Sequence, residues 1–173
     1  MATLAELPKK YPQLFKNDYF YFECGDGWYT LLNCLLNQIH WKLKRYSEVV
    51  EIQQKVLSKG EEPLPWISEY FEKNPVDPLE AFSIHQIKEK FGGLRFYWGC
   101  DVDSDETREL RGATDLAESL SYTICEECGA PASGTKTAKG SGWIRSLCET
   151  HHQERQSQLD ARGAALIPQN KAE

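Results

Sequence analysis

Cysteine and histidine residues in the last third of the chain have the spacing of a metal-binding site. The pattern is Cys125-x-x-Cys128-Gly129, then, after a further stretch of chain, Cys148-x-x-His151. Zinc prefers four tetrahedral nitrogen and sulfur ligands, and two short pairs let each segment present both of its ligands from one local turn. We therefore predict that these two pairs bind one zinc ion.

The identity of the fourth ligand has an alternative in the adjacent His152. We prefer His151, because it stands three residues after Cys148, and residues three apart at the start of a helix lie on the same face. Four protein ligands leave no position for substrate or water, so the zinc is predicted to be structural and not catalytic. Its binding free energy would then stabilise a module too small to fold alone.

Two glycine-containing segments elsewhere carry charged side chains that could bind a ligand or do chemistry. They supply the candidate binding residues Glu23, Asp26, Trp28, Lys88, Lys90 and Arg95. If the two segments meet in space, acid and base would line one cleft and an enzyme would be possible. The alternative is structural, with Asp26 capping a helix and the basic residues on a solvated hairpin face.

A basic stretch between the two halves of the cysteine and histidine pattern could contact nucleic acid. It contains Lys136, Lys139 and Arg145 and has no acidic residue from Gly129 to Leu147. The stretch also lacks histidine, so a nuclease active site of the His-Asn-His type has no general base there.

The overall composition is that of a folded, acidic protein. Of the 173 residues, 40% are hydrophobic and 27% are charged, and the net charge is −6. The excess of acidic residues lies before residue 123, and the rest of the chain is balanced. This distribution disfavours non-specific duplex binding, which needs clustered basic residues.

Cysteine usage and hydropathy suggest a reducing compartment. Neither a membrane-spanning segment nor a signal peptide is evident, so a cytoplasmic location is expected. We accordingly predict that Cys24, Cys34 and Cys100 are buried reduced thiols in the core and not disulfides.

Apolar spacing predicts the elements that position these residues. Tyr19 to Phe22 is typical of a strand, and helical spacing begins after Gly27 and continues to Leu57, with Gly60 as the stop. A short helix is expected over Trp66 to Lys73.

The second half is predicted to begin with a β-hairpin. Its strands are Phe82 to Lys90, for which a helix remains an alternative, and Leu94 to Trp98. A helix follows from a capping box at Asp103 to about Ser121. In the metal-binding part, Ser133 to Ser141 is expected to be a loop and Gly142 to Arg145 a strand.

The predicted fold class is α+β. A small N-terminal unit, residues 1–122, would contain the long helix and the hairpin. A treble-clef-like zinc module, residues 123–160, would follow, and residues 161–173 would form a disordered tail.

Three motifs together resemble a family of small uncharacterised proteins encoded by phages and prophages. The motifs are Glu23-Cys24-Gly25-Asp26-Gly27-Trp28, Lys88 through Tyr97, and the cysteine and histidine pattern preceded by Trp143-Ile144-Arg145. The resemblance covers about residues 11–152, except residues 47–80. It implies a phage accessory role and no particular reaction.

The hypothesis we favour is a zinc-stabilised, non-enzymatic protein that binds or inhibits a host or defence protein. Its acidic N-terminal unit would block a basic partner surface. The alternatives are a nucleic-acid-binding zinc-finger protein and an enzyme that uses the Glu23 and Asp26 turn.

Overall fold

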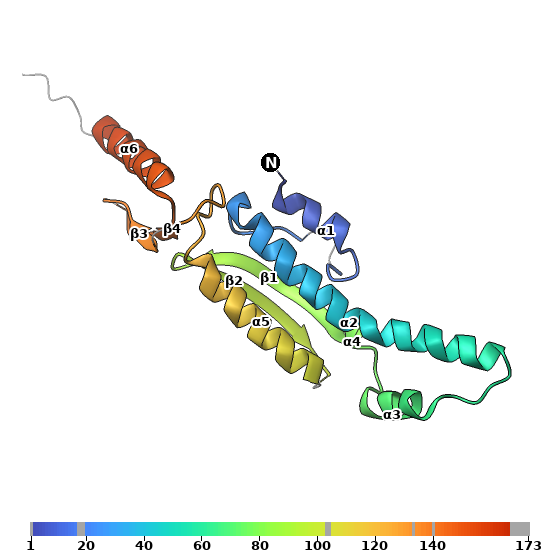
Figure 1. Ribbon diagram of the computed structural model, residues 1–173. Coiled ribbons are helices and arrows are strands. Elements are labelled where there is room, and N and C mark those ends of the chain that lie inside the picture. The colour runs from blue at the N-terminus through green and yellow to red at the C-terminus, as the bar shows by residue number, and fades with distance from the viewer. Residues whose placement is uncertain (1, 17–19, 103–104, 133, 140, 167–173) are drawn as a thin grey trace, which may run out of the picture.

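The protein is an α+β structure in which a long helix packs on a β-hairpin and a small Cys/His module follows at one end (Figure 1). The structure is a computed structural model that describes residues 2–16, 20–102, 105–132, 134–139 and 141–166. Its helices are α1 (Leu7–Lys10), α2 (Tyr29–Ser58), α3 (Pro65–Lys73), α4 (Pro78–Ala81), α5 (Asp105–Ser121) and α6 (Glu149–Leu166). Its strands are β1 (Phe82–Lys90), β2 (Gly93–Cys100), β3 (Thr135–Thr137) and β4 (Ile144–Ser146).

Helix α2 is the central element, and its apolar spacing predicted it correctly. Leu32, Leu36, Ile39 and Leu43 recur at helical intervals and are fully buried. They pack with residues of the N-terminal segment and of both hairpin strands in one core. Gly60, with a φ of +74°, follows the helix as expected. Beyond the core, α2 continues past the hairpin toward α3, which lies at the far end of the molecule (Figure 1).

Two expectations about the segment before α2 are wrong. Phe20 to Phe22 form no strand; Phe20 and Phe22 instead pack against Phe15, while Tyr19 lies outside the described residues. Asp26 does not cap α2, because a 3₁₀ turn over Asp26–Trp28 precedes the helix. Its carboxylate instead accepts a hydrogen bond from the backbone N–H of Leu4 at 2.8 Å.

The hairpin β1–β2 is antiparallel, with a register irregularity between Ile84 and Gln86. Because Phe82–Lys90 is a strand, the alternative that this segment forms a helix is wrong. One set of its side chains is buried in the core, and α5 lies along the open edge of β2, where Glu118 accepts a hydrogen bond from the backbone N–H of Phe96. Ser121 does the same for Leu94, so both backbone donors are satisfied by α5. The predicted cap at Asp103 lies outside the described residues.

The C-terminal module contains a second antiparallel hairpin and a helix. Strand β4 begins two residues later than predicted, and β3 lies within the segment expected to be a loop. Helix α6 continues to Leu166, into the segment from residue 161 that was expected to be a disordered tail. Residues 167–173 lie outside the described part.

The remaining cysteines differ from the expectation of a fully buried set. Cys24 and Cys100 are half-buried beside the core, as free thiols. Cys34 is exposed, because it lies on the face of α2 opposite to the apolar stripe. Within the described residues, no helix combines the length and the apolar character that a membrane span requires.

Candidate functional site

The four residues selected by spacing lie together in the structure. One ligand atom from each of Cys125, Cys128, Cys148 and His151 lies within 4.8 Å of all the others. The Cys128 and Cys148 sulfurs are 3.9 Å apart, and His151 Nδ1 lies 3.5 Å from the Cys125 sulfur and 3.2 Å from the Cys148 sulfur. These four side chains form a candidate metal centre.

Local backbone structure explains how each pair reaches this centre. The first pair lies on a tight turn, in which the Gly129 N–H donates to the Cys125 carbonyl at 2.8 Å and Gly129 has a φ of +75°. Glycine adopts that conformation without strain. Cys148 directly precedes α6, and His151 lies in its first turn, where the His152 N–H donates to the Cys148 carbonyl. A turn, a hairpin and a helix start therefore converge, as in a treble clef.

The spacing of the ligand atoms fits a tetrahedral metal. Typical zinc–sulfur and zinc–nitrogen bonds imply sulfur–sulfur edges of about 3.8 Å and sulfur–nitrogen edges of about 3.5 Å. The observed 3.9 Å and 3.5 Å separations are close to those edges, the 3.2 Å from His151 Nδ1 to the Cys148 sulfur is shorter, and all four ligand atoms lie within 4.8 Å of one another. Three thiolates with one imidazole are the donors of structural zinc sites, so this cluster could hold such an ion with no open position.

A carboxylate lies near the histidine of the cluster. With Nδ1 facing the sulfurs, the Nε2 of His151 lies 3.8 Å from Glu154 Oε2, one turn further along α6. At this distance the two groups are not hydrogen-bonded. His152 lies outside the cluster; it is half-buried, and its Nδ1 has no hydrogen-bond partner among the described residues.

Replacing His151 with alanine is expected to weaken zinc retention strongly, because one ligand is lost and water enters the site. The matched variant His152→Ala should retain zinc, since its ring does not reach the cluster. Chelator competition on both purified variants, followed by limited proteolysis of residues 123–152, measures the difference. If His152→Ala loses zinc and His151→Ala retains it, the ligand assignment is wrong.

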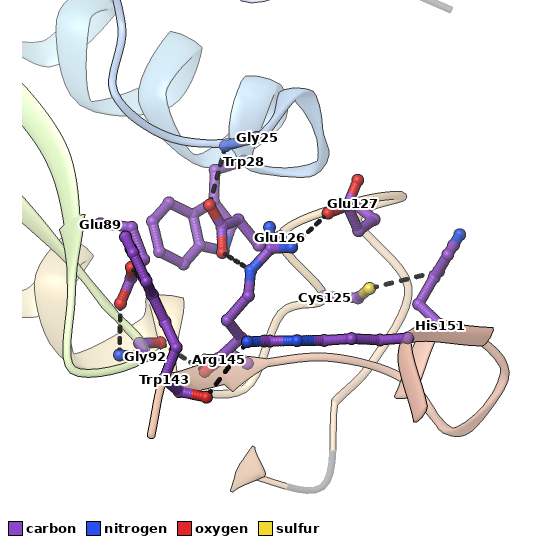
Figure 2. A network of polar contacts seen from close by, with 12 residues as sticks. Gly25, Trp28, Glu89, Gly92, Cys125, Glu126, Glu127, Trp143, Arg145 and His151 are labelled. Carbon is purple, nitrogen blue, oxygen red and sulfur yellow. Dashed lines mark hydrogen bonds and ion pairs between the residues drawn. The ribbon is translucent and has the colours of Figure 1, made fainter. Parts of the chain in front are cut away.

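The candidate metal centre is adjacent to an ion-pair network that joins the C-terminal module to the rest of the protein (Figure 2). Glu126, between the first two cysteines, is buried and accepts a hydrogen bond from Arg145 Nε at 2.9 Å. Its other carboxylate oxygen accepts from the backbone N–H of Gly25 at 3.0 Å. Arg145 also pairs with Glu127 at 2.6 Å. One carboxylate thus links the module to the turn before α2.

Close contact at this junction leaves no room for a side chain at Gly25, Gly27 or Gly92. The Gly27 N–H donates to the Glu126 carbonyl at 2.8 Å, and a Cβ on Gly27 would collide with the carbonyl of Cys125. Gly92, at the tip of the β1–β2 hairpin, has a φ of +80° and contacts Thr135. Its carbonyl accepts from the Ser146 hydroxyl at 2.6 Å. Both glycine-rich motifs therefore serve as contact surfaces for the C-terminal module.

The carboxylates of Glu23 and Asp26, expected to act as a pair in the turn before α2, each bind a different partner. Glu23 accepts a hydrogen bond from Gln86 Nε2 at 2.6 Å, whereas Asp26 is directed to Leu4. Trp28 is fully buried and donates from Nε1 to the Ile124 carbonyl at 3.1 Å, so it belongs to the core and not to a binding surface.

The two glycine-containing segments meet where Glu23 pairs with Lys88 of β1, but the cleft that Glu23 lines does not have Lys88, Lys90 or Arg95 among its lining residues. Lys88 lies over the Tyr97 ring and Lys90 over the Phe91 ring. Arg95 donates to the Tyr122 hydroxyl at 3.1 Å and lies 3.6 Å from Glu118. The cleft that Glu23 does line faces the C-terminal module instead.

Two of the three candidate nucleic-acid contacts form ion pairs within the protein. Lys136 pairs with Glu149 on α6, and Arg145 is held by Glu126 and Glu127. A phosphate would have to compete with these carboxylates. The nucleic-acid contact stays a prediction for these residues, although folding brings acidic residues that are distant in the sequence close to Lys136 and Arg145.

Sequence reasoning missed the acidic residues of the network and the residues of the neighbouring cleft. Glu126 and Glu127 stand between two metal ligands. Carboxylates beside thiolates are stable only with a cation nearby, so their position in the sequence could have indicated a basic partner. Nothing in the sequence indicated that Trp143 and Arg155 would face the same cleft as Glu23.

Comparison with known proteins does not assign a function to this site. No family model, no curated protein and no solved structure matches the chain. The contacts, charges and burial of the described residues are therefore the basis for inferring what the protein does.

Proposed function

We propose that the protein is a zinc-stabilised, non-enzymatic binding protein that uses a projecting helical arm to bind a protein partner. The arm consists of residues 48–73, the last part of α2 together with α3. The observation that carries the proposal is the exposure of four large apolar side chains on it. They are Ile52 (39% exposed), Leu57 (51%), Leu64 (43%) and Trp66 (46%).

The shape of the arm supports a role in binding. It extends away from the core and from the Cys/His module, as Figure 1 shows. Tryptophan is among the residues that dominate binding energy at interfaces, and exposed apolar side chains on a projecting element are available to a partner. A projecting apolar arm is therefore suited to contact another protein.

The charge of the arm indicates the kind of partner. Residues 48–73 contain more glutamate than lysine and no arginine. An acidic surface attracts a basic partner and repels the phosphates of nucleic acid. We propose a protein partner whose contact surface combines apolar and basic residues. In the phage setting that the motifs suggest, it would be a host or defence protein.

The role proposed for the metal is structural. Four protein ligands saturate a zinc ion, and the adjoining network ties the module to the turn before α2. Zinc would therefore stabilise the junction and not activate a substrate.

The state of the groups near Glu23 supports a non-enzymatic assignment. Burial, followed by the charges of Glu126 and Asp26, raises the pKa of the Cys24 thiol to about 12. A thiol with this pKa stays protonated at neutral pH and is a poor nucleophile. Glu23 and Asp26 accept separate hydrogen bonds and do not act as a pair.

The test of the proposal compares two exposed tryptophans. Trp66→Ala, on the arm, is expected to weaken partner binding by about 2 kcal/mol, as for an interface hot spot. Trp41→Ala should leave the affinity unchanged, because Trp41 is also exposed but lies outside the arm. Tagged full-length protein would first isolate the partner from host lysate, and the affinity of each variant would then be measured with the purified partner.

Two results would contradict this assignment. Equal affinities for the wild type, Trp66→Ala and Leu57→Ala would place the interface elsewhere. Sub-micromolar, salt-sensitive binding to duplex or single-stranded nucleic acid, weakened by reversing the charges of Lys136 and Lys139, would favour the nucleic-acid alternative instead.

A further inference from the structure

The β1–β2 hairpin has one face in the core and the other toward solvent. One set of its side chains, which includes Ile87 and Phe96, is buried in the core that the hairpin shares with α2 and α5. Successive side chains of a strand point to opposite faces of a sheet. The register pairs Lys88 with Arg95, and Tyr97 follows two residues later on β2. These three side chains therefore lie on the outward face.

The outward face is basic. Its strand positions carry Lys88, Lys90 and Arg95 and no carboxylate. Within the described residues, neither lysine forms an ion pair; Lys88 lies over the Tyr97 ring at 5.2 Å and Lys90 over the Phe91 ring at 5.4 Å. Both ammonium groups are therefore available to a phosphate, and each phosphate contact releases counterions into solution.

Rings lie on this face beside the cations. The Tyr122 ring lies against the backbone of Gly93, where a Cβ would collide with it. A Cβ on Gly99 would lie only 2.9 Å from the His85 ring. The ring of Tyr97, on the same strand as the two glycines, is 41% exposed. Rings on a basic sheet surface offer π-faces on which the bases of a single strand stack.

Carboxylates border the outward face at both of its edges. Glu23, which lies beside β1 opposite Lys88, accepts a hydrogen bond from Gln86. At the other edge, Glu118 of α5 lies 3.6 Å from Arg95. The basic strip between them is only two strands wide. A duplex carries phosphates on both of its strands, and its second strand would meet these carboxylates, so charge complementarity favours a single strand.

We propose that the outward face of the β1–β2 hairpin binds single-stranded nucleic acid, with a base stacked on Tyr97 and phosphates on Lys88 and Lys90. Arg95 donates to the Tyr122 hydroxyl at 3.1 Å and so holds that ring on the face. Stacking accepts every base, so the binding has little sequence preference. The inference does not rest on the proposed function, because the arm is not part of the hairpin. It also differs from the nucleic-acid alternative that uses residues 136–145.

Fluorescence anisotropy of the zinc-loaded full-length protein tests the proposal with four labelled probes. They are oligodeoxythymidine and oligouridine of about 12 nucleotides, a DNA duplex of the same length, and an oligoglutamate peptide. At low salt, at least one single strand should bind at least about tenfold more tightly than the duplex, whose paired bases cannot stack on Tyr97. Tighter binding of one strand identifies DNA or RNA as the preferred source, and equal binding indicates that the face accepts both. The oligoglutamate tests an acidic protein segment as the occupant.

The salt dependence measures the phosphate contacts. The logarithm of the association constant should fall with the logarithm of the salt concentration with a slope of about −1.4, as expected for two contacts with a single strand. Lys88→Gln should weaken both strands and reduce the steepness of that slope by about 0.7. The matched control Lys139→Gln removes the same charge from an exposed residue of the C-terminal module and should leave the affinity and the slope unchanged.

A second pair of variants tests the stacking contact. Tyr97→Ala should weaken single-strand binding by about tenfold. The matched control Trp41→Ala removes an exposed ring of α2 that lies 5.2 Å from the Lys44 ammonium, the same distance as in the Tyr97 and Lys88 pair, and should have no effect. Zinc content and the unfolding midpoint of each variant identify a loss of fold.

Four results would each overturn the proposal. They are no binding of either single strand at low salt, equal binding of the duplex, equal binding of oligoglutamate, and wild-type affinity in folded Tyr97→Ala or Lys88→Gln. A loss in Lys139→Gln as large as that in Lys88→Gln would move the contact to the C-terminal module.

Discussion

Replacing Cys125 with serine is expected to abolish stoichiometric zinc binding and to unfold the C-terminal module. Cys125 is fully buried, and its sulfur lies 3.5 Å from His151 Nδ1 in the ligand cluster. Zinc in sites of this kind contributes an apparent binding free energy of about 10–16 kcal/mol, most of which is folding free energy for a small module. Elemental analysis should fall from about one zinc per chain to nearly none.

The exposed Cys34 provides the matched control for this variant. Cys34→Ser removes a thiol from α2, far from the cluster, and should leave both the zinc content and the protection of residues 123–152 unchanged. Hydrogen exchange of the two variants separates the loss of metal from a general effect of replacing cysteine. A metal-free wild type whose module remains protected would show that zinc is not required for its fold.

Local patterns were sufficient to predict the elements whose stability depends on local spacing. The stripe from Leu32 to Leu43 predicted α2, and the turn at Gly92 with its flanking apolar residues predicted the hairpin. The ligand cluster was predictable for the same reason, since each pair of ligands lies within one turn of chain. In each case the residues that determine the element are near one another in the sequence.

Errors arose where a distant segment determines the local structure. Asp26 had the residue type of a helix cap, but the N-terminal segment brings the backbone N–H of Leu4 to its carboxylate. Phe20 and Phe22 pack against Phe15, and the described part of this segment pairs with β1 at Glu23, opposite Lys88. Neither partner is visible from local propensity.

The same reason explains why the junction was not predicted. Gly25 and Glu126 are 101 residues apart, and Glu126 and Arg145 belong to different segments of the module. The sequence showed glycine-rich motifs and a basic stretch but not that they meet. In the folded protein Arg145, a candidate nucleic-acid contact, forms a mostly buried ion pair with Glu126.

Replacing Glu126 with alanine is therefore expected to destabilise the protein by about 3 kcal/mol or more. The Glu126 carboxylate is buried and accepts hydrogen bonds from both Arg145 and the Gly25 backbone. Removing one partner of a buried pair leaves the other charge uncompensated, which costs about 3–5 kcal/mol. We expect the lower part of that range, because Arg145 retains Glu127. Denaturant unfolding of the zinc-loaded protein measures the change in the free energy of unfolding.

Glu127→Ala is the matched control, because it removes the neighbouring carboxylate that pairs with the same arginine. The Glu127 side chain is 43% exposed, compared with 4% for Glu126. A solvent-exposed ion pair contributes only about 0–1 kcal/mol, so this variant should unfold close to the wild type. Both variants should retain one zinc, since neither side chain is a ligand. Equal, small losses for the two variants would mean that the junction is held by the backbone contacts at Gly27 and Gly92 and not by the Glu126 carboxylate.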